Sequence, residues 1–145
     1  MKKTIVFTVF LLVSSLSLFS QSEQVAGKYI HRIESKENDV FEYEMTLHED
    51  GTFDFYYHSF ITRGIPPEKD YYGKGTWRVE NNVVSFTTDA QKDRDEKYTL
   101  DFTNTKARFV TKSPRDKTDK IVVTKLQFLK SDIFWMSRID LLKIN

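Results

Sequence analysis

The sequence LHEDGTFDFYYHSF (residues 47–60), followed after a loop by GKGTWRV (residues 73–79), carries the clearest structural signal in this chain of 145 residues. Asp50 and Gly51 predict a hairpin turn, because glycine adopts positive φ without steric cost. Apolar residues alternate with polar ones on both sides of this turn: Phe41, Tyr43, Met45 and Leu47 before it, and Phe53, Phe55 and Tyr57 after it. Alternation with period two is typical of strands that bury one face.

Short strands separated by turn residues continue along the rest of the chain. We expect strands at residues 27–34, 40–48, 52–61, 73–80, 83–88, 97–103, 106–112 and 120–129, and one or two more within 133–144. No stretch shows a capped helical period. Evenly spaced short strands of this kind indicate an antiparallel barrel or a sandwich.

The lengths of the connections favour the barrel. Tight connections at residues 49–51, 81–82, 104–105 and 131–132 alternate with longer ones at 35–39, 62–72, 89–96 and 113–119. In an up-and-down meander, alternate connections lie at opposite ends, whereas a Greek-key sandwich is not expected to sort its loops in this way. The sequence therefore predicts an all-β, antiparallel up-and-down β-barrel of about eight to ten strands, with a base of tight turns and a mouth of long loops.

Pairing across the tight turns places apolar residues opposite one another. The expected pairs are Leu47 with Phe53, Met45 with Phe55, Tyr43 with Tyr57, Val79 with Val84, Trp77 with Phe86, Phe102 with Ala107, Leu100 with Phe109, and Phe128 with Trp135. Directly opposite residues share a face of the sheet, and a slip of one residue would destroy every match.

Residues 1–20 have the layout of a secretory signal peptide: two lysines, an apolar run from residue 5 to 13, and Ser20 before the polar Gln21. The alternative is an uncleaved membrane anchor, but an apolar segment of about 15 residues is shorter than the roughly 20 of a spanning helix. We therefore expect cleavage near Ser20, a single domain at 21–145, and export to the periplasm or the extracellular space without stable membrane insertion.

Composition limits the partners that we expect. The chain has no cysteine, so neither a disulfide nor a lipid on cysteine is expected, and its 12 Phe, 7 Tyr and 2 Trp must provide the core. The formal net charge is +1, which argues against a nucleic-acid partner, since nucleic acid requires a basic face. We expect a monomer.

Three short motifs resemble those of small bacterial lipocalin-like domains of the calycin type. They are the Gly-x-Tyr opening at residues 27–29, the DGTF hairpin at 50–53 and the GTW strand at 75–77. The resemblance spans roughly half of the mature chain. It implies an antiparallel barrel without a catalytic residue, in a class of proteins that mostly bind small or apolar ligands or have no known activity.

A candidate binding site follows from the register. If Tyr29, His31 and Ile33 face the interior, His31 pairs with Tyr43, which in turn pairs with Tyr57. An imidazole and two phenols at one level can anchor a small ligand, or they can form a cluster that only satisfies its own hydrogen bonds. With the mouth residues of the loop 62–72, the predicted ligand-binding residues are His31, Tyr43, Tyr57, Arg63, Tyr71 and Tyr72.

Other chemistry is not indicated by the sequence. We find no nucleophile elbow, phosphate-binding glycine loop or zinc-protease motif, and His48 and His58 would lie on the order of 16 Å apart along their hairpin. We therefore expect no enzyme activity, metal or cofactor. The predicted function is binding of a small, mostly apolar ligand in the barrel. The alternative, favoured by the many large inward residues, is a filled barrel acting through its surface as an interaction or envelope-stress module.

Overall fold

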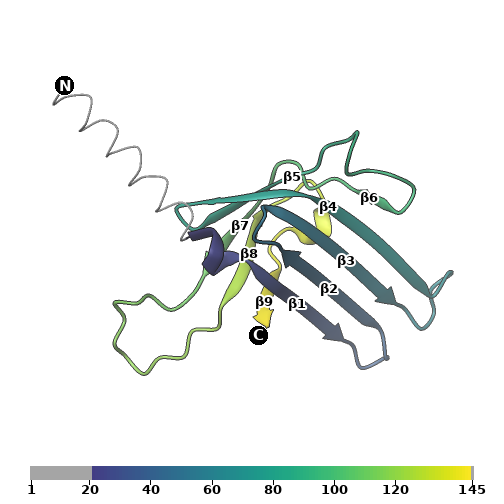
Figure 1. Cartoon of the computed structure of the whole chain (residues 1–145). Coiled ribbons are helices and arrows are strands. Elements are labelled where there is room, and N and C mark those ends of the chain that lie inside the picture. Colours follow the sequence, from purple (N-terminus) through teal and green to yellow (C-terminus); the bar gives the residue numbers. More distant parts are fainter. Residues whose placement is uncertain (1–20, 145) are drawn as a thin grey trace.

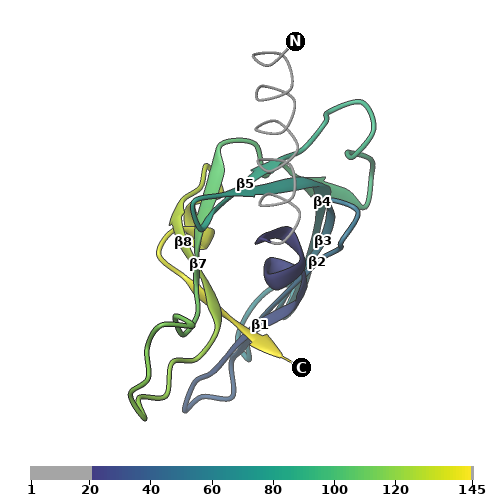
Figure 2. The ribbon, with the colours of Figure 1, turned by 60° about the vertical axis from the view of Figure 1, so that its left-hand side comes forward.

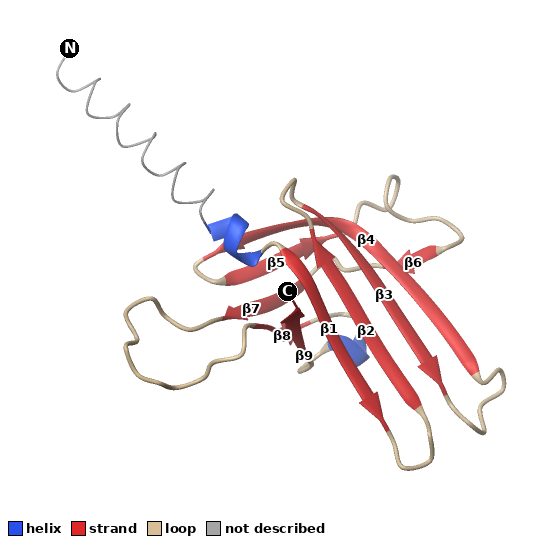
Figure 3. Ribbon diagram, turned by 60° about the horizontal axis from the view of Figure 1, so that its bottom comes forward, coloured by secondary structure: helices blue, strands red, loops and turns tan. Residues whose placement is uncertain are grey.

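The computed structural model describes residues 21–144, so the predicted signal peptide at 1–20 lies outside the described residues. A short helical segment at residues 21–25 precedes the sheet (Figures 1 and 3). The elements that follow are β1 (Gly27–Glu34), β2 (Val40–Leu47), β3 (Thr52–Phe60), β4 (Glu68–Glu80), β5 (Val83–Thr87), β6 (Tyr98–Leu100), β7 (Thr105–Val110), β8 (Lys125–Lys130), the 3-10 helix η1 (Phe134–Met136) and β9 (Asp140–Ile144).

Eight of these strands close an antiparallel barrel. The order β3-β2-β1-β9-β8-β7-β5-β4 returns to β3 through the β3–β4 pairing, and β6 is an additional strand that runs parallel to β4. This arrangement confirms the predicted all-β antiparallel barrel of eight to ten strands. Figure 1 shows β1 to β4 continuing beyond the other strands as a long curved sheet.

The hairpins of the first half have the predicted register. Leu47 pairs with Phe53 across one turn, and Trp77 pairs with Phe86 across the next. Gly51 has φ of 86°, while Asn81 and Asn82 have φ of 50° and 61°. These are left-handed conformations that glycine and asparagine tolerate better than other residues, so the turn chemistry fixes the register.

Asp50 stabilises its turn in a way that depends on pH. Its carboxylate accepts hydrogen bonds from the Thr52 hydroxyl at 2.6 Å and from the Thr52 amide at 2.8 Å. These bonds, first of all the one from the hydroxyl, hold the pKa of Asp50 below its usual range. Because the folded-state pKa is depressed, the stabilisation is present above the unfolded pKa of about 4 and is lost as the pH falls through the folded-state pKa.

We therefore expect Thr52→Val, which removes one donor and keeps a β-branched shape, to lower the stability at pH 7 and to have little effect at pH 2. Urea unfolding of the variant and the parent at both pH values measures this. Thr87→Val, at another exposed strand threonine, is the control. An equal penalty at the two pH values would contradict the assignment.

The predicted hairpin between residues 97–103 and 106–112 is wrong. β7 pairs instead with β5, with Val84 opposite Ala107 and Phe86 opposite Thr105. β6 leaves the barrel wall and lies beside β4 at Tyr72 and Gly73. It does so because β5 covers β4 only from Thr76 onward, and the uncovered first half of β4 takes β6 as its neighbour.

The absence of β6 from the barrel wall changes how the loops are distributed. One end of the barrel, which we call the closed end, holds the helical segment 21–25, the turns at 49–51 and 81–82, and the long loop 111–124. Val25 is buried there, and Figure 2 shows the helical segment across the barrel opening. The loops 35–39 and 61–67 lie at the opposite, open end. The prediction that every long loop lies at one end is therefore wrong for the second half of the chain.

Aromatic rings fill the middle of the barrel. The ring of Phe102, which follows β6, lies 5.2 Å from Phe53, 5.0 Å from Phe55 and 6.2 Å from Phe86. Phe86 in turn stacks on Phe128 at 5.7 Å. All five side chains are buried. A Cβ on Gly73 would lie 2.6 Å from the Phe102 ring, so this glycine makes room for the ring that closes the side of the barrel.

Candidate functional site at the open end

Four neighbouring strands place four predicted site residues in one row. His31 pairs with Tyr43, Tyr43 with Tyr57, and Tyr57 with Tyr71. The ring centroids of successive residues lie 5.7, 4.9 and 6.0 Å apart. The predicted level of one imidazole and two phenols therefore exists in the structure, and β4 adds a third phenol to it.

Trp135, which the sequence predicted on a strand opposite Phe128, completes this row. Its ring stacks on Tyr57 at 4.6 Å and lies 5.9 Å from Tyr43 and 6.5 Å from Tyr71. We call His31, Tyr43, Tyr57, Tyr71 and Trp135 the aromatic layer.

The predicted pairing of Phe128 with Trp135 is wrong, because β9 begins only at Asp140, which pairs with Gln127. The tryptophan belongs to the 3-10 helix η1, within the run IFWM at residues 133–136. Four consecutive apolar residues lack the alternation of a half-buried strand. That run is the signal from which the interruption could have been inferred.

A pocket of about 420 Å³ opens beside the aromatic layer. Its walls combine apolar and polar side chains: His31, Ile33, Tyr43, Trp135, Ser137, Arg138, Ile139 and Asp140. Burial, and to a smaller extent the neighbouring Tyr57, raises the pKa of Tyr43, so its phenol stays protonated at neutral pH and can donate a hydrogen bond. Asp140 is paired with Lys125 at 2.6 Å.

The polar atoms of the layer are open to a ligand. Within residues 21–144, the side chains of His31, Tyr43 and Tyr57 form no hydrogen bond with one another or with other groups. Every fully buried side-chain nitrogen or oxygen in these residues does have a partner. The imidazole and phenol polar atoms are therefore not fully buried, and solvent or a ligand can reach them. A cluster that only satisfied its own hydrogen bonds would show such bonds between its members.

Arg138 brings a positive charge to the rim of this pocket. Its backbone has φ of 68°, a left-handed conformation that costs free energy for a residue with a Cβ. The conformation is held from both sides, since Phe128 accepts from the Arg138 amide at 3.0 Å and donates to the Ile139 carbonyl at 2.9 Å. Within residues 21–144, the Arg138 side chain forms no ion pair or hydrogen bond.

Two predicted site residues lie away from the aromatic layer. Tyr72 is on the outer face, with its ring 5.1 Å from Tyr56, 6.0 Å from Tyr98 and 4.6 Å from the Lys97 ammonium. Arg63 is exposed in the loop 61–67 and makes no described contact with the layer. The register accounts for Tyr72, because adjacent residues of a strand point to opposite faces.

The other two histidines form separate pairs. His48 bonds Asp54 at 2.7 Å, and His58 bonds Asp70 at 2.9 Å, both between exposed or half-exposed groups. In residues 21–144, no three His, Asp or Glu side chains lie close enough together to hold a metal ion.

No helix in the described chain combines the length and the apolar character that a membrane crossing requires. No protein-family model, curated protein or solved structure matches this sequence. The fold itself is an antiparallel closed barrel of eight strands with one extra strand, an architecture consistent with a lipocalin-like fold.

Proposed function

We propose that this chain is an exported, non-enzymatic lipocalin-like protein of the calycin type that binds one small, mostly apolar molecule at the open end of its barrel. The observation that carries the proposal is the aromatic layer beside an open pocket of about 420 Å³. Pockets for small molecules are typically apolar and aromatic, with a few polar groups that fix orientation. Trp135 and Tyr43 offer the apolar surface, and His31 and Arg138 offer the polar groups.

The filled core restricts where the ligand lies. Because Phe102 and its neighbouring rings occupy the middle of the barrel, the proposed ligand rests on the aromatic layer instead of entering deeply. A flat or ring-containing apolar body suits such a surface, since aromatic groups prefer stacked or edge-on contact with one another. Export follows from the signal-peptide pattern of residues 1–20.

A second candidate function is supported by the outer face. Tyr56, Tyr72 and Tyr98 form a cluster there, with the Lys97 ammonium 4.6 Å above the Tyr72 ring and 5.4 Å above the Tyr98 ring. Tyrosines on an exposed sheet are typical of protein interfaces. In this alternative the filled barrel is a rigid support, and a partner protein binds its surface.

Binding of the uncharged dye Nile red tests the first candidate. Ile33 lines the pocket and is 46% exposed, whereas Leu129, which does not line it, is 44% exposed. Ile33→Glu places an unpaired charge against an apolar ligand, which costs at least about 1.4 kcal/mol, or tenfold in affinity. We expect that loss in a fluorescence titration of Ile33→Glu, and none for the matched control Leu129→Glu.

Equal dye affinity in both variants, or no saturable binding by the parent, would reject the open-end pocket and favour the surface function. Native mass spectrometry of protein purified from the organism that makes it adds two readings. The intact mass shows whether residues 1–20 have been removed, and any retained mass identifies a co-purified small molecule.

A further inference from the structure

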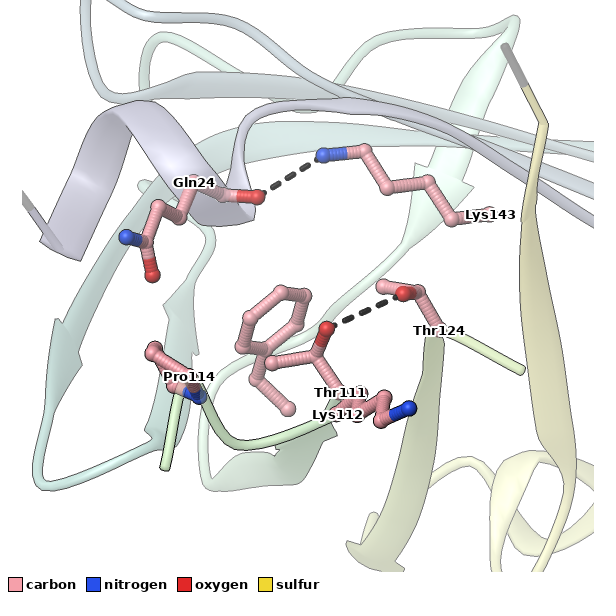
Figure 4. A pocket seen from close by; sticks show the side chains of 7 residues that line it. Gln24, Thr111, Lys112, Pro114, Thr124 and Lys143 are labelled. Atoms are coloured by element: carbon pink, nitrogen blue, oxygen red, sulfur yellow. Dashed lines mark hydrogen bonds between the residues drawn. The ribbon is translucent and has the colours of Figure 1, made fainter. Parts of the chain in front are cut away.

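The closed end holds a lysine in a defined place. Lys143 on β9 extends over the ring of Tyr29, with its ammonium 5.8 Å from the ring centroid, and donates to the Gln24 carbonyl at 2.8 Å (Figure 4). A Cβ on Gly27 would lie 2.7 Å from the Lys143 Cε. The glycine therefore leaves room for the lysine stem. The position of the ammonium is set by β9, which carries the lysine, by Gly27 and Tyr29 of β1, and by Gln24 of the helical segment.

This ammonium borders a pocket of about 480 Å³ at the closed end of the barrel. The pocket is lined by Gln24, Phe109, Thr111, Lys112, Pro114, Thr124 and Lys143. No carboxylate is among these residues. Figure 4 shows Lys143 reaching across one side of the pocket, with Thr111 and Thr124 bonded to each other on another.

Neither lysine of this pocket has its charge neutralised within residues 21–144. Lys143 bonds the Gln24 carbonyl, and Lys112 bonds the Thr118 carbonyl at 2.6 Å. An ammonium has three donors, so both retain donors for a further acceptor. Burial without an acidic partner also lowers the pKa of Lys143, as expected for a charge that is desolvated and not compensated.

We propose that this pocket binds a small oxyanion, a phosphate or carboxylate group, between Lys143 and Lys112. Because the Thr111 and Thr124 hydroxyls bond each other at 3.1 Å, the pair has one hydroxyl proton left to donate to an anion. The side chains of Phe109 and Pro114 form the apolar part of the lining. Charge-assisted hydrogen bonds to an oxyanion are stronger than those between neutral groups. The site is separate from the proposed open-end site and does not depend on it.

A purely structural role for Lys143 would require only its bond to Gln24, which ties the helical segment 21–25 to β9. That role needs neither Lys112 nor the two threonines. The experiment therefore measures anion affinity in variants that change each group separately, and it reports folding at the same time.

Amide chemical shifts in two-dimensional ¹H–¹⁵N NMR are followed while inorganic phosphate replaces chloride at constant ionic strength, with acetate in a second arm. Saturable shifts are expected at Gln24, Thr111 and Thr124. Lys143→Met and Lys112→Met, which keep most of the stem and remove the charge, should each weaken binding about tenfold or more. Lys106→Met, at an exposed β7 lysine outside the pocket lining, should leave the affinity unchanged.

Saturation by phosphate alone assigns a phosphate group, and saturation by acetate as well extends the site to carboxylates. Shifts that never saturate with either anion, or equal affinities in the parent and Lys112→Met, overturn the proposal. If Lys143→Met does not fold, the double variant Thr111→Val/Thr124→Val decides together with Lys112→Met. It leaves Lys143 in place, removes both hydroxyls and with them the donor that the pair offers, and should weaken binding several-fold, so an unchanged affinity in both rejects the site.

Discussion

Phe102→Ala is expected to lower the free energy of unfolding by about 3–5 kcal/mol, the usual cost of emptying a buried aromatic site. Phe102 is fully buried and contacts the rings of Phe53, Phe55 and Phe86. It also closes the side of the barrel where β4 and β5 separate. The cavity cannot collapse easily, because the surrounding strands are held by their own hydrogen-bond ladders.

Chemical denaturation of Phe102→Ala measures this cost. Phe134→Ala is the matched control, since the Phe134 side chain is 86% exposed and its loss should change stability by about 0.5 kcal/mol or less. Similar stabilities for the two variants would mean that Phe102 does not fill the core and that its ring does not cover the side of the barrel beside β4.

Trp77→Ala should have an effect of the same size, about 3–5 kcal/mol, for a different structural reason. Trp77 belongs to the barrel wall, pairs with Phe86, and is 6% exposed. Its indole Nε1 donates to the His48 carbonyl at 3.0 Å, which joins β4 to the DGTF turn. The side chain therefore contributes both core volume and a link between two hairpins.

Trp77→Phe separates these two contributions, because it keeps most of the ring volume and removes the donor. We expect a smaller loss for Trp77→Phe than for Trp77→Ala, and a loss within about 0.5 kcal/mol for Arg78→Ala on the exposed face of the same strand. Equal losses for the phenylalanine and alanine variants would assign the whole effect to the hydrogen bond and contradict the packing argument.

The filled core and the two pockets suggest how the barrel is used. Because rings occupy its middle, the two ends are separate, and each presents different chemistry: aromatic rings with an arginine at the open end, and two lysines with two threonines at the closed end. The two proposals therefore fail or succeed independently of each other. A dye at the open end and phosphate at the closed end probe different residues.

Local signals in the sequence determined the first half of the fold. Turn residues with left-handed φ and strict alternation specify a hairpin and its register, since a slip of one residue would turn the buried face to solvent. For this reason the pairing of Tyr43 with Tyr57, and that of Trp77 with Phe86, could be predicted before the structure was known. The His31–Tyr43 pairing followed in the same way from a short loop.

Only the tertiary structure decided the second half. Residues 97–103 have the alternation of a barrel strand, but β6 lies beside the half of β4 that β5 leaves uncovered, where a glycine at position 73 leaves space for the Phe102 ring. Trp135 reaches the aromatic layer, and Lys143 reaches Gln24, across sequence separations that no turn controls. Contacts of this kind depend on which distant surfaces pack together, and neither alternation nor turn chemistry encodes that choice.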